Sequence, residues 1–151
     1  AGHPRDPARW GRLKDYAREK LTRPGMSLAD WHVALTYAAT GDDDALDGWI
    51  RAIEELAAAG RYPSGSVIPT VARGFAAYQR GDYAATIDLI EPMLPERERI
   101  GGSRAQGDLV EATLMQAYLA SGRDAEARRL AAERRKGPAR LPVTGIEGTV
   151  A

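Results

Sequence analysis

One turn between two helices recurs three times in this sequence of 151 residues. Each copy places a glycine after an alanine-containing apolar stretch and close before an aspartate, and these glycines are Gly41, Gly81 and Gly122. They stand 40 and 41 residues apart, and a fixed period of that size, built on helical pairs, is typical of an α-solenoid. A single pair is too small to bury its own apolar face, so each pair must stack on the next. We therefore expect an all-α superhelix, a right-handed stack of about three helical hairpins.

A further helix is expected before the first hairpin. Asp6 is suited to cap its N-terminus, and Pro7 to occupy the first helical position, where the missing N–H costs nothing. Its apolar stripe is expected to consist of Trp10, Leu13, Tyr16, Ala17 and Leu21. The later helices are expected at 28–40, at 45–59, from the turn that contains Pro69 to 80, from 82 to a kink or stop near 91, at 104–120 and at 124–135.

Short polar side chains mark several helix starts. Ser27 and Ser103 are the N-cap candidates of the helices that follow them. Three consecutive aspartates at 42–44 follow the first turn glycine, at a helix N-terminus where carboxylates are favoured. We interpret them as caps rather than as metal ligands.

The composition limits the classes of function. Lysine and arginine number 21, as do aspartate and glutamate, so nucleic acid has no overall electrostatic attraction to the chain. There is no cysteine, which excludes disulfides and thiolate metal sites, and no apolar run approaches the ~18 residues of a membrane span. We expect a cytoplasmic protein without cofactor, metal, membrane or nucleic-acid partner. Its repeat domain should span 6–136, with 1–5 disordered or a cloning remnant and 137–151 an irregular tail.

The central repeat resembles the tetratricopeptide signature. Gly74 is a small residue seven positions before Gly81, and Tyr83 is an aromatic residue two positions after it. The period is nearer 40 than the usual 34, and Thr86 stands where alanine is usual. The resemblance implies tetratricopeptide-like repeats rather than a standard array.

A longer resemblance covers most of residues 9–135. The stretch 99–114, Arg-Ile-Gly-Gly-Ser-Arg-Ala-Gln-Gly-Asp-Leu-Val-Glu-Ala-Thr-Leu, looks like the C-terminal motif of the tetratricopeptide repeat protein 38 family. The stretch 28–32, Leu-Ala-Asp-Trp-His, is similar to that family's Asp-x-His helix, and the two occur in the same order. Gly107 replaces the family's arginine, and Arg104, on about the same helix face, is a candidate substitute. The resemblance implies helical repeats rather than a reaction, and a C-terminal fragment or shortened relative of longer proteins.

The same two stretches supply the candidate ligand- or partner-binding residues. These are Asp30, His32, Ser103, Arg104, Gln106 and Asp108. In one hypothesis they form a polar cluster on a concave groove. In the alternative, His32 makes a hydrogen bond at a helix contact, Ser103 is a helix cap, and Asp108 binds loop amides or an arginine.

Other chemistry has weaker support in the sequence. A Ser–His–Asp hydrolase lacks the Gly-x-Ser-x-Gly elbow, and the Gly-Gly-Ser loop lacks the Gly-Lys-Ser/Thr ending of a nucleotide-binding loop, although its free N–H groups could hold a small anion. The basic cluster at 128, 129 and 134–136 is interpreted as complementing a helix C-terminus.

The prediction for function is a non-catalytic module that binds a protein or peptide. The alternative is a small-ligand or enzymatic pocket centred on His32 and the loop 103–108. A binding module should have a groove lined by aromatic and scattered polar residues, whereas a pocket should bring His32 to the loop. Exposed solenoid ends also make a homodimer plausible.

Overall fold

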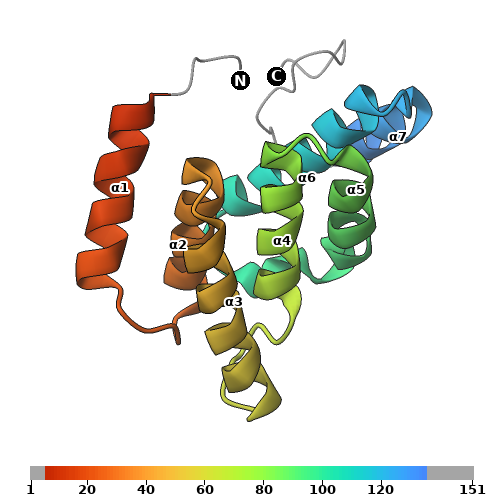
Figure 1. Ribbon diagram of the computed structural model, residues 1–151. Helices are drawn as coiled ribbons and strands as arrows, with labels where there is room; N and C mark the ends of the chain where they lie inside the picture. The colour runs from red at the N-terminus through yellow and green to blue at the C-terminus, as the bar shows by residue number, and fades with distance from the viewer. Residues whose placement is uncertain (1–5, 136–151) are drawn as a thin grey trace.

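The computed structural model describes residues 6–135, which form an all-α helical-repeat fold without any strand in that range. Figure 1 shows the helices in chain order. They are α1 (Pro7–Lys20), α2 (Ser27–Thr40), α3 (Asp43–Ala58), α4 (Val67–Gln79), α5 (Tyr83–Ile90), the 3₁₀ helix η1 (Glu91–Ile100), α6 (Arg104–Ala120) and α7 (Asp124–Arg135). The predictions for residues 1–5, Lys136 and 137–151 lie outside the described residues.

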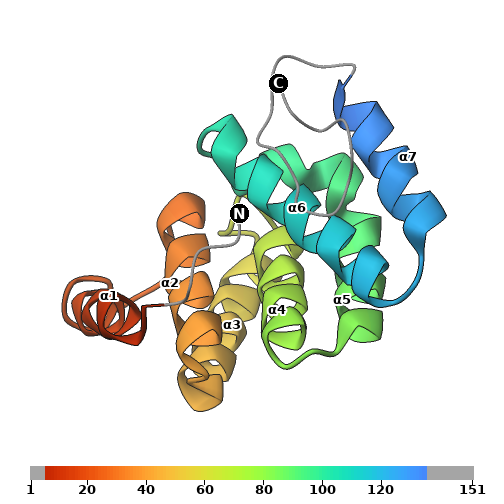
Figure 2. The same cartoon turned by 90° about the horizontal axis from the view of Figure 1, so that it is seen from above.

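The helices pack as three successive hairpins, α2/α3, α4/α5 and α6/α7 (Figures 1 and 2). The first helices of the hairpins form one row, because α2 packs on α4 and α4 on α6. The second helices join neighbouring hairpins, since α3 contacts α4 and α5 contacts α6. Each apolar face is therefore covered by the next hairpin, as the period predicts.

The three predicted turn glycines end the first helix of each hairpin. Gly41, Gly81 and Gly122 have φ of +68°, +77° and +71°, a left-handed conformation that side chains disfavour. The next helix then starts on an aspartate cap in the first two hairpins. The Asp42 carboxylate accepts from the N–H of Ala45 (3.4 Å) and Asp82 from the N–H of Ala85 (3.0 Å). The capping role predicted for the aspartates is confirmed at Asp42.

Gly74 lets α4 and α5 approach closely. A Cβ atom at this position would lie 2.5 Å from Cγ1 of Ile90, which is fully buried.

Around this contact, the core runs continuously through the hairpins. Its largest fully buried side chains include Trp31, Ile50, Ile53, Ile68, Ile90, Leu114 and Met115.

Helix α1 packs on α2 and begins as predicted, with Asp6 accepting from the N–H of Arg9 (3.1 Å) and Pro7 in the first turn. Its predicted apolar stripe is only partly right. Ala17 is buried, whereas Leu13 and Tyr16 are 45% and 58% exposed. The physical reason is that α1 packs against α2 alone among the described helices, so one neighbour covers a narrow stripe.

Two helix ends differ from the predictions. Ser27 is the first residue of α2 rather than its cap; the cap position is Met26, and the Ser27 hydroxyl oxygen accepts from Ser64 (2.6 Å). The stop predicted near 91 is confirmed, but the chain continues as η1, whose last residue, Ile100, is buried. This ten-residue segment is half exposed, and Ile100 is its one buried residue.

Candidate functional site

A groove of about 300 Å³ lies between α1 and α6, over a floor from α2 and α4. Figure 2 shows the arrangement of these four helices. Five of its eleven lining residues are large apolar or aromatic side chains: Trp10, Leu35, Phe75, Tyr78 and Leu109. Small residues lower the floor and one wall: Ala38, Ala39 and Ala112. Thr113, Gln79 and Gln116 supply the polar atoms. No lining residue carries a charge at neutral pH, so the groove presents an uncharged, mainly apolar surface.

The local sequence explains this shape. The last two turns of α2 are alanine-rich next to Gly41, and these short side chains leave space above the backbone at the floor of the groove. Tyr78 stands in the last turn of α4, where its ring packs edge-on against Tyr83 with centroids 5.7 Å apart. Burial raises the pKa of the Tyr78 hydroxyl above its usual value, and the nearby Tyr83 adds to this. Tyr78 is therefore a neutral hydrogen-bonding group at neutral pH.

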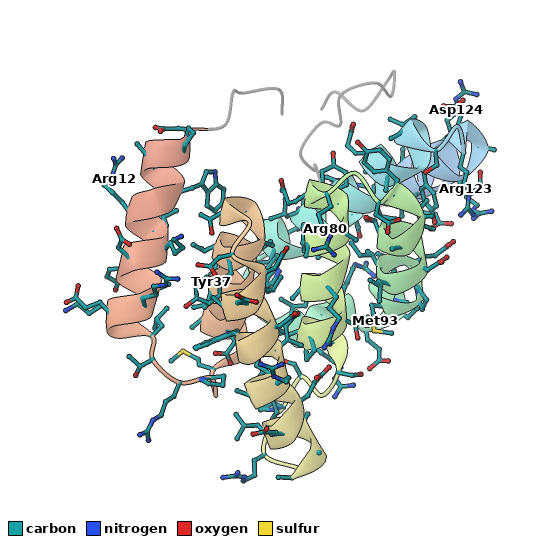
Figure 3. The ribbon with its side chains drawn as sticks, viewed as in Figure 1. Arg12, Tyr37, Arg80, Met93, Arg123 and Asp124 are labelled. Atoms are coloured by element: carbon teal, nitrogen blue, oxygen red, sulfur yellow. The ribbon has the colours of Figure 1, made fainter. Side chains whose placement is uncertain are left out.

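The apolar surface continues from the groove along α1. Trp10, Leu13 and Tyr16 follow one another at intervals of three residues, so they form one row on the helix. Lys14 and Arg18 occupy another side, where both pair with Asp42 at 3.4 and 2.7 Å. Arg12 points away from α2 (Figure 3). On the opposite wall, Leu109 of α6 is 42% exposed.

The predicted polar residues belong to three different local arrangements. The first surrounds Asp30, which is buried. Its Oδ2 accepts from the N–H of Gly25 (3.0 Å) and the hydroxyl of Tyr62 (2.9 Å), and its backbone carbonyl accepts from Nε1 of Trp49 (3.2 Å). Burial raises the pKa of Asp30, and the two hydrogen bonds oppose this rise. Through these hydrogen bonds, Asp30 holds the loop before α2 and the loop between α3 and α4 against the first turn of α2.

His32 is exposed on α2. Its Nδ1 lies 2.6 Å from the carbonyl oxygen of Leu28, one turn earlier, and its ring lies 5.5 Å from that of Trp31. A Cβ atom at Gly102 would lie 2.7 Å from Cδ1 of Leu28. The glycine loop therefore reaches the start of α2, although the hydrogen bond of His32 is made within its own helix.

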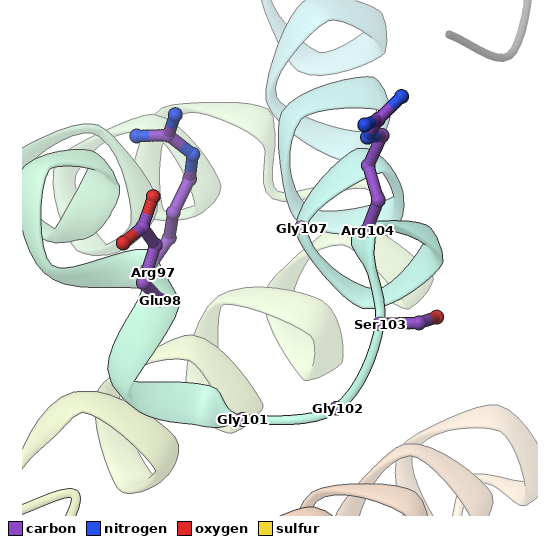
Figure 4. A pocket seen from close by; sticks show the side chains of 7 residues that line it. All are labelled: Arg97, Glu98, Gly101, Gly102, Ser103, Arg104 and Gly107. Carbon is purple, nitrogen blue, oxygen red and sulfur yellow. The ribbon is translucent and has the colours of Figure 1, made fainter. Parts of the chain in front are cut away.

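The second arrangement is the loop before α6. Gly101, Gly102, Ser103 and the flanking Arg97 and Arg104 line an open cleft of about 370 Å³, together with Glu98 and Gly107. Figure 4 shows the two arginines on opposite sides of the loop and Ser103 pointing away from the space between them.

Ser103 and Gln106 cap this helix. The Ser103 Oγ accepts from the N–H of Ala105 (3.3 Å), and the Gln106 Oε1 accepts from the N–H of Ser103 (2.9 Å). The predicted cap is confirmed, and it engages part of the N–H groups that an anion would need.

The third arrangement is a buried charge cluster that joins α6, α7 and η1. Arg134 lies between Asp108 (Nη2 to Oδ1, 3.4 Å) and Glu111 (Nε to Oε2, 3.3 Å), and all three are buried. Arg97 approaches Glu111 from η1 at 3.0 Å. Asp108 is thus paired with an arginine, as the alternative hypothesis expected. The interpretation of the basic cluster as complementing a helix C-terminus is wrong for Arg134, because α6 supplies two carboxylates that cover it.

The six predicted residues are therefore divided among these arrangements. Ser103 and Gln106 are in contact, whereas Asp30 and Asp108 are held by different elements. Whether any of the six binds a ligand stays a prediction. The groove residues were not predicted as a site. Trp10 and Leu109 are remote in sequence, and the one available signal was the apolar row on α1.

Residues 6–135 contain no group of three or more histidine, cysteine, aspartate or glutamate residues arranged to hold a metal ion. Within the same range, no helix has both the length and the apolar character of a membrane span. Comparisons with protein-family models, with curated proteins and with solved structures find no match to this chain.

Proposed function

We propose that this chain is a non-catalytic helical-repeat module that binds a protein or peptide segment in the groove between α1 and α6. The observation that carries the proposal is the groove itself, which has Trp10 on one wall and Leu109 on the other, a floor of aromatic and small apolar side chains, and a few polar groups. Its volume of about 300 Å³ is at the lower end of ligand-binding sites. This is room for a few side chains of a bound segment.

Aromatic side chains that are partly exposed in a groove are suited to act as binding anchors. Trp10 and Tyr78 have this position, and Leu109 extends the apolar contact on the opposite wall. Burying these surfaces against a partner would be favourable by about 25 cal/mol for each Å² of apolar area. A bound segment would gain most from apolar side chains directed at the floor.

The test is to select peptides against the full chain and measure their binding to matched variants. Leu109→Glu places a charge in the groove, where a bound apolar segment would desolvate it. Met26→Glu makes the same kind of change at a residue that is 66% exposed and outside the groove. We expect Leu109→Glu to lower the affinity at least tenfold and Met26→Glu to leave it unchanged. Equal binding to both variants would exclude the groove as the binding site.

A pocket centred on His32 and the loop 103–108 is the second candidate. The approach of Gly102 to Leu28 favours it, because the loop lies beside the helix that carries His32. The engagement of Asp108 with Arg134 and the outward direction of Ser103 give it less support than the groove. The measurement that distinguishes the two is the histidine NMR titration with and without a selected peptide. A shift confined to His32, with Trp10 fluorescence unchanged, would favour the pocket.

We also propose kinship with the tetratricopeptide repeat protein 38 family, a cytoplasmic location and a homodimer formed through the solenoid edge. The exposed row at Leu13 and Tyr16 supports the homodimer, because apolar side chains at an open end favour association. Light scattering over a range of concentrations tests it, and a monomer at the highest concentration would refute it. The structure of a family member would test the kinship through the loop at 101–103.

A further inference from the structure

The last turn of α7 reaches α6, which forms one wall of the groove, through the side chain of Arg134. Arg134, near the end of α7, lies 3.4 Å from Asp108 and 3.3 Å from Glu111 on α6. The next residues of α6, Leu109 and Ala112, line the groove on another face of the same helix turns. An α-helix with its side chains is about 10–12 Å across. The end of α7 is therefore separated from the groove by the width of α6 and the length of the Arg134 side chain.

The sequence beyond α7 contains an uncharged apolar run. Residues 141–146 read Leu-Pro-Val-Thr-Gly-Ile, between Arg140 and Glu147. Leu141 is six residues beyond Arg135, and six extended residues span at most about 20 Å. This reach is about twice the width of α6, which leaves length to pass the Arg134 side chain and enter the groove.

We propose that residues 141–146 of this chain bind in the groove and compete there with an external partner, which makes the segment an internal regulator of the binding function proposed above. The lining favours an uncharged occupant, because a charged side chain would lose water without gaining an opposite charge. Pro142 suits an extended segment and brings no N–H group that would need a partner. Attachment to α7 gives the segment an effective concentration of the order of millimolar. Even a weak intrinsic affinity is then enough for occupancy.

Disulfide trapping tests the contact directly, because the chain has no cysteine of its own. The test pair is Leu109→Cys with Val143→Cys, in the full chain. The control pair is Arg128→Cys with Val143→Cys, in which Arg128 is exposed on α7 and closer to Val143 in sequence. A segment that does not bind the groove would form the control disulfide at least as fast. We expect the groove pair to form its intramolecular disulfide at least tenfold faster, and equal or slower formation would overturn the proposal.

Competition provides a second, independent test. The synthetic peptide Leu-Pro-Val-Thr-Gly-Ile, with both ends blocked, is the probe. The shift of Trp10 emission to shorter wavelength, as the apolar probe covers the indole, is the readout, since Trp31 and Trp49 are only 0% and 8% exposed.

The first variant, Leu141→Asp with Ile146→Asp, places charges in the run. The control variant, Thr149→Asp with Val150→Asp, adds the same charge outside it. If the run occupies the groove nine-tenths of the time, the first variant should bind the probe about tenfold more tightly than the control.

Equal probe affinity in the two variants would overturn the internal occupant while leaving the proposed function intact. Failure of the probe to bind either variant would overturn it as well, because the run would then have no affinity for the groove. The proposed function has its own test in peptides selected without reference to this segment. If the selected peptides bind Leu109→Glu and Met26→Glu equally well, the groove is rejected as the binding site, whatever the disulfide result.

Discussion

Replacing Gly74 by alanine tests whether the close approach of α4 and α5 requires a residue without a side chain. The new Cβ atom would lie 2.5 Å from Cγ1 and 3.0 Å from Cδ1 of Ile90, and 3.5 Å from Cβ of Leu89. Ile90 is fully buried, so its side chain cannot relieve the contact by turning into solvent. Either the two helices must separate or Ile90 must leave its preferred rotamer.

The expected net cost of Gly74→Ala is about 1–2 kcal/mol. Overpacking a core by a methyl group typically costs about 1–3 kcal/mol, and replacing glycine by alanine inside a helix returns about 0.5–1 kcal/mol. Gly48→Ala is the matched control, because Gly48 also lies within a helix but no atom lies within 4 Å of its added Cβ. There the steric cost is absent, and a gain of about 0.5–1 kcal/mol is expected.

Urea denaturation followed by far-ultraviolet circular dichroism measures both variants. Thermal unfolding gives a second measure of the same difference, because a loss of 1 kcal/mol lowers the Tm of a chain of this size by about 2–4 °C. A double variant with Ile90→Ala identifies the cause, because the smaller side chain makes room for the new methyl group. The pair should show a favourable coupling of about 0.5–3 kcal/mol. If Gly74→Ala were as stabilising as Gly48→Ala, the steric explanation would be refuted.

Three further perturbations address the polar groups. Asp30→Asn tests the raised pKa of Asp30, which makes the folded state bind the proton more tightly than the unfolded state. The stability advantage of wild type over this variant should therefore fall as pH rises above 3.8, the ordinary pKa of the group. Urea midpoints measured across pH check this, and a constant difference would contradict it. Arg134→Leu should cost about 3–5 kcal/mol, since it leaves the buried Asp108 without that partner, whereas the exposed Arg128→Leu should change stability by less than about 0.5 kcal/mol; similar thermal midpoints for the two would show that the buried pair contributes little. Ser103→Ala should cost about 1 kcal/mol by loss of the N-cap and Ser103→Gly only a few tenths, and equal denaturation midpoints for the two variants would argue against capping by the hydroxyl.

Local signals made much of the fold predictable. The turn glycines fix where helices end, because their positive φ values are unfavourable for other residues. Val110, Leu114 and Tyr118 of α6 are buried and follow one another at four-residue steps, so the helical period of the sequence is enough to mark this face. Periodicity could not show how much of α1 would be covered. Leu13 and Tyr16 have the same pattern as core residues, and only the absence of a second neighbour among the described helices exposes them.

The partners of the polar residues were less predictable, since they depend on contacts between distant segments. Asp108 and Glu111 are three residues apart on the buried face of α6, and this pair of buried carboxylates was a signal that a cation must face them. The sequence did not show which of the clustered arginines would do so, because only the packing of α7 selects Arg134. The groove is likewise a tertiary feature, for Trp10 and Leu109 meet it from opposite walls.

The 3₁₀ helix η1 has a consequence for the geometry of the array. It inserts ten residues between the second and third hairpins and contacts α2, α4, α5 and α6. A tetratricopeptide unit has 34 residues, and η1 contributes to the longer spacing only between Gly81 and Gly122, since the interval from Gly41 to Gly81 contains no such segment. Figure 2 shows α6 lying across α4, and η1 packs against both helices. Because the step between units determines the curvature of a solenoid, a change in the length of η1 should move α6, which forms one wall of the groove, although η1 contributes no residue to the lining.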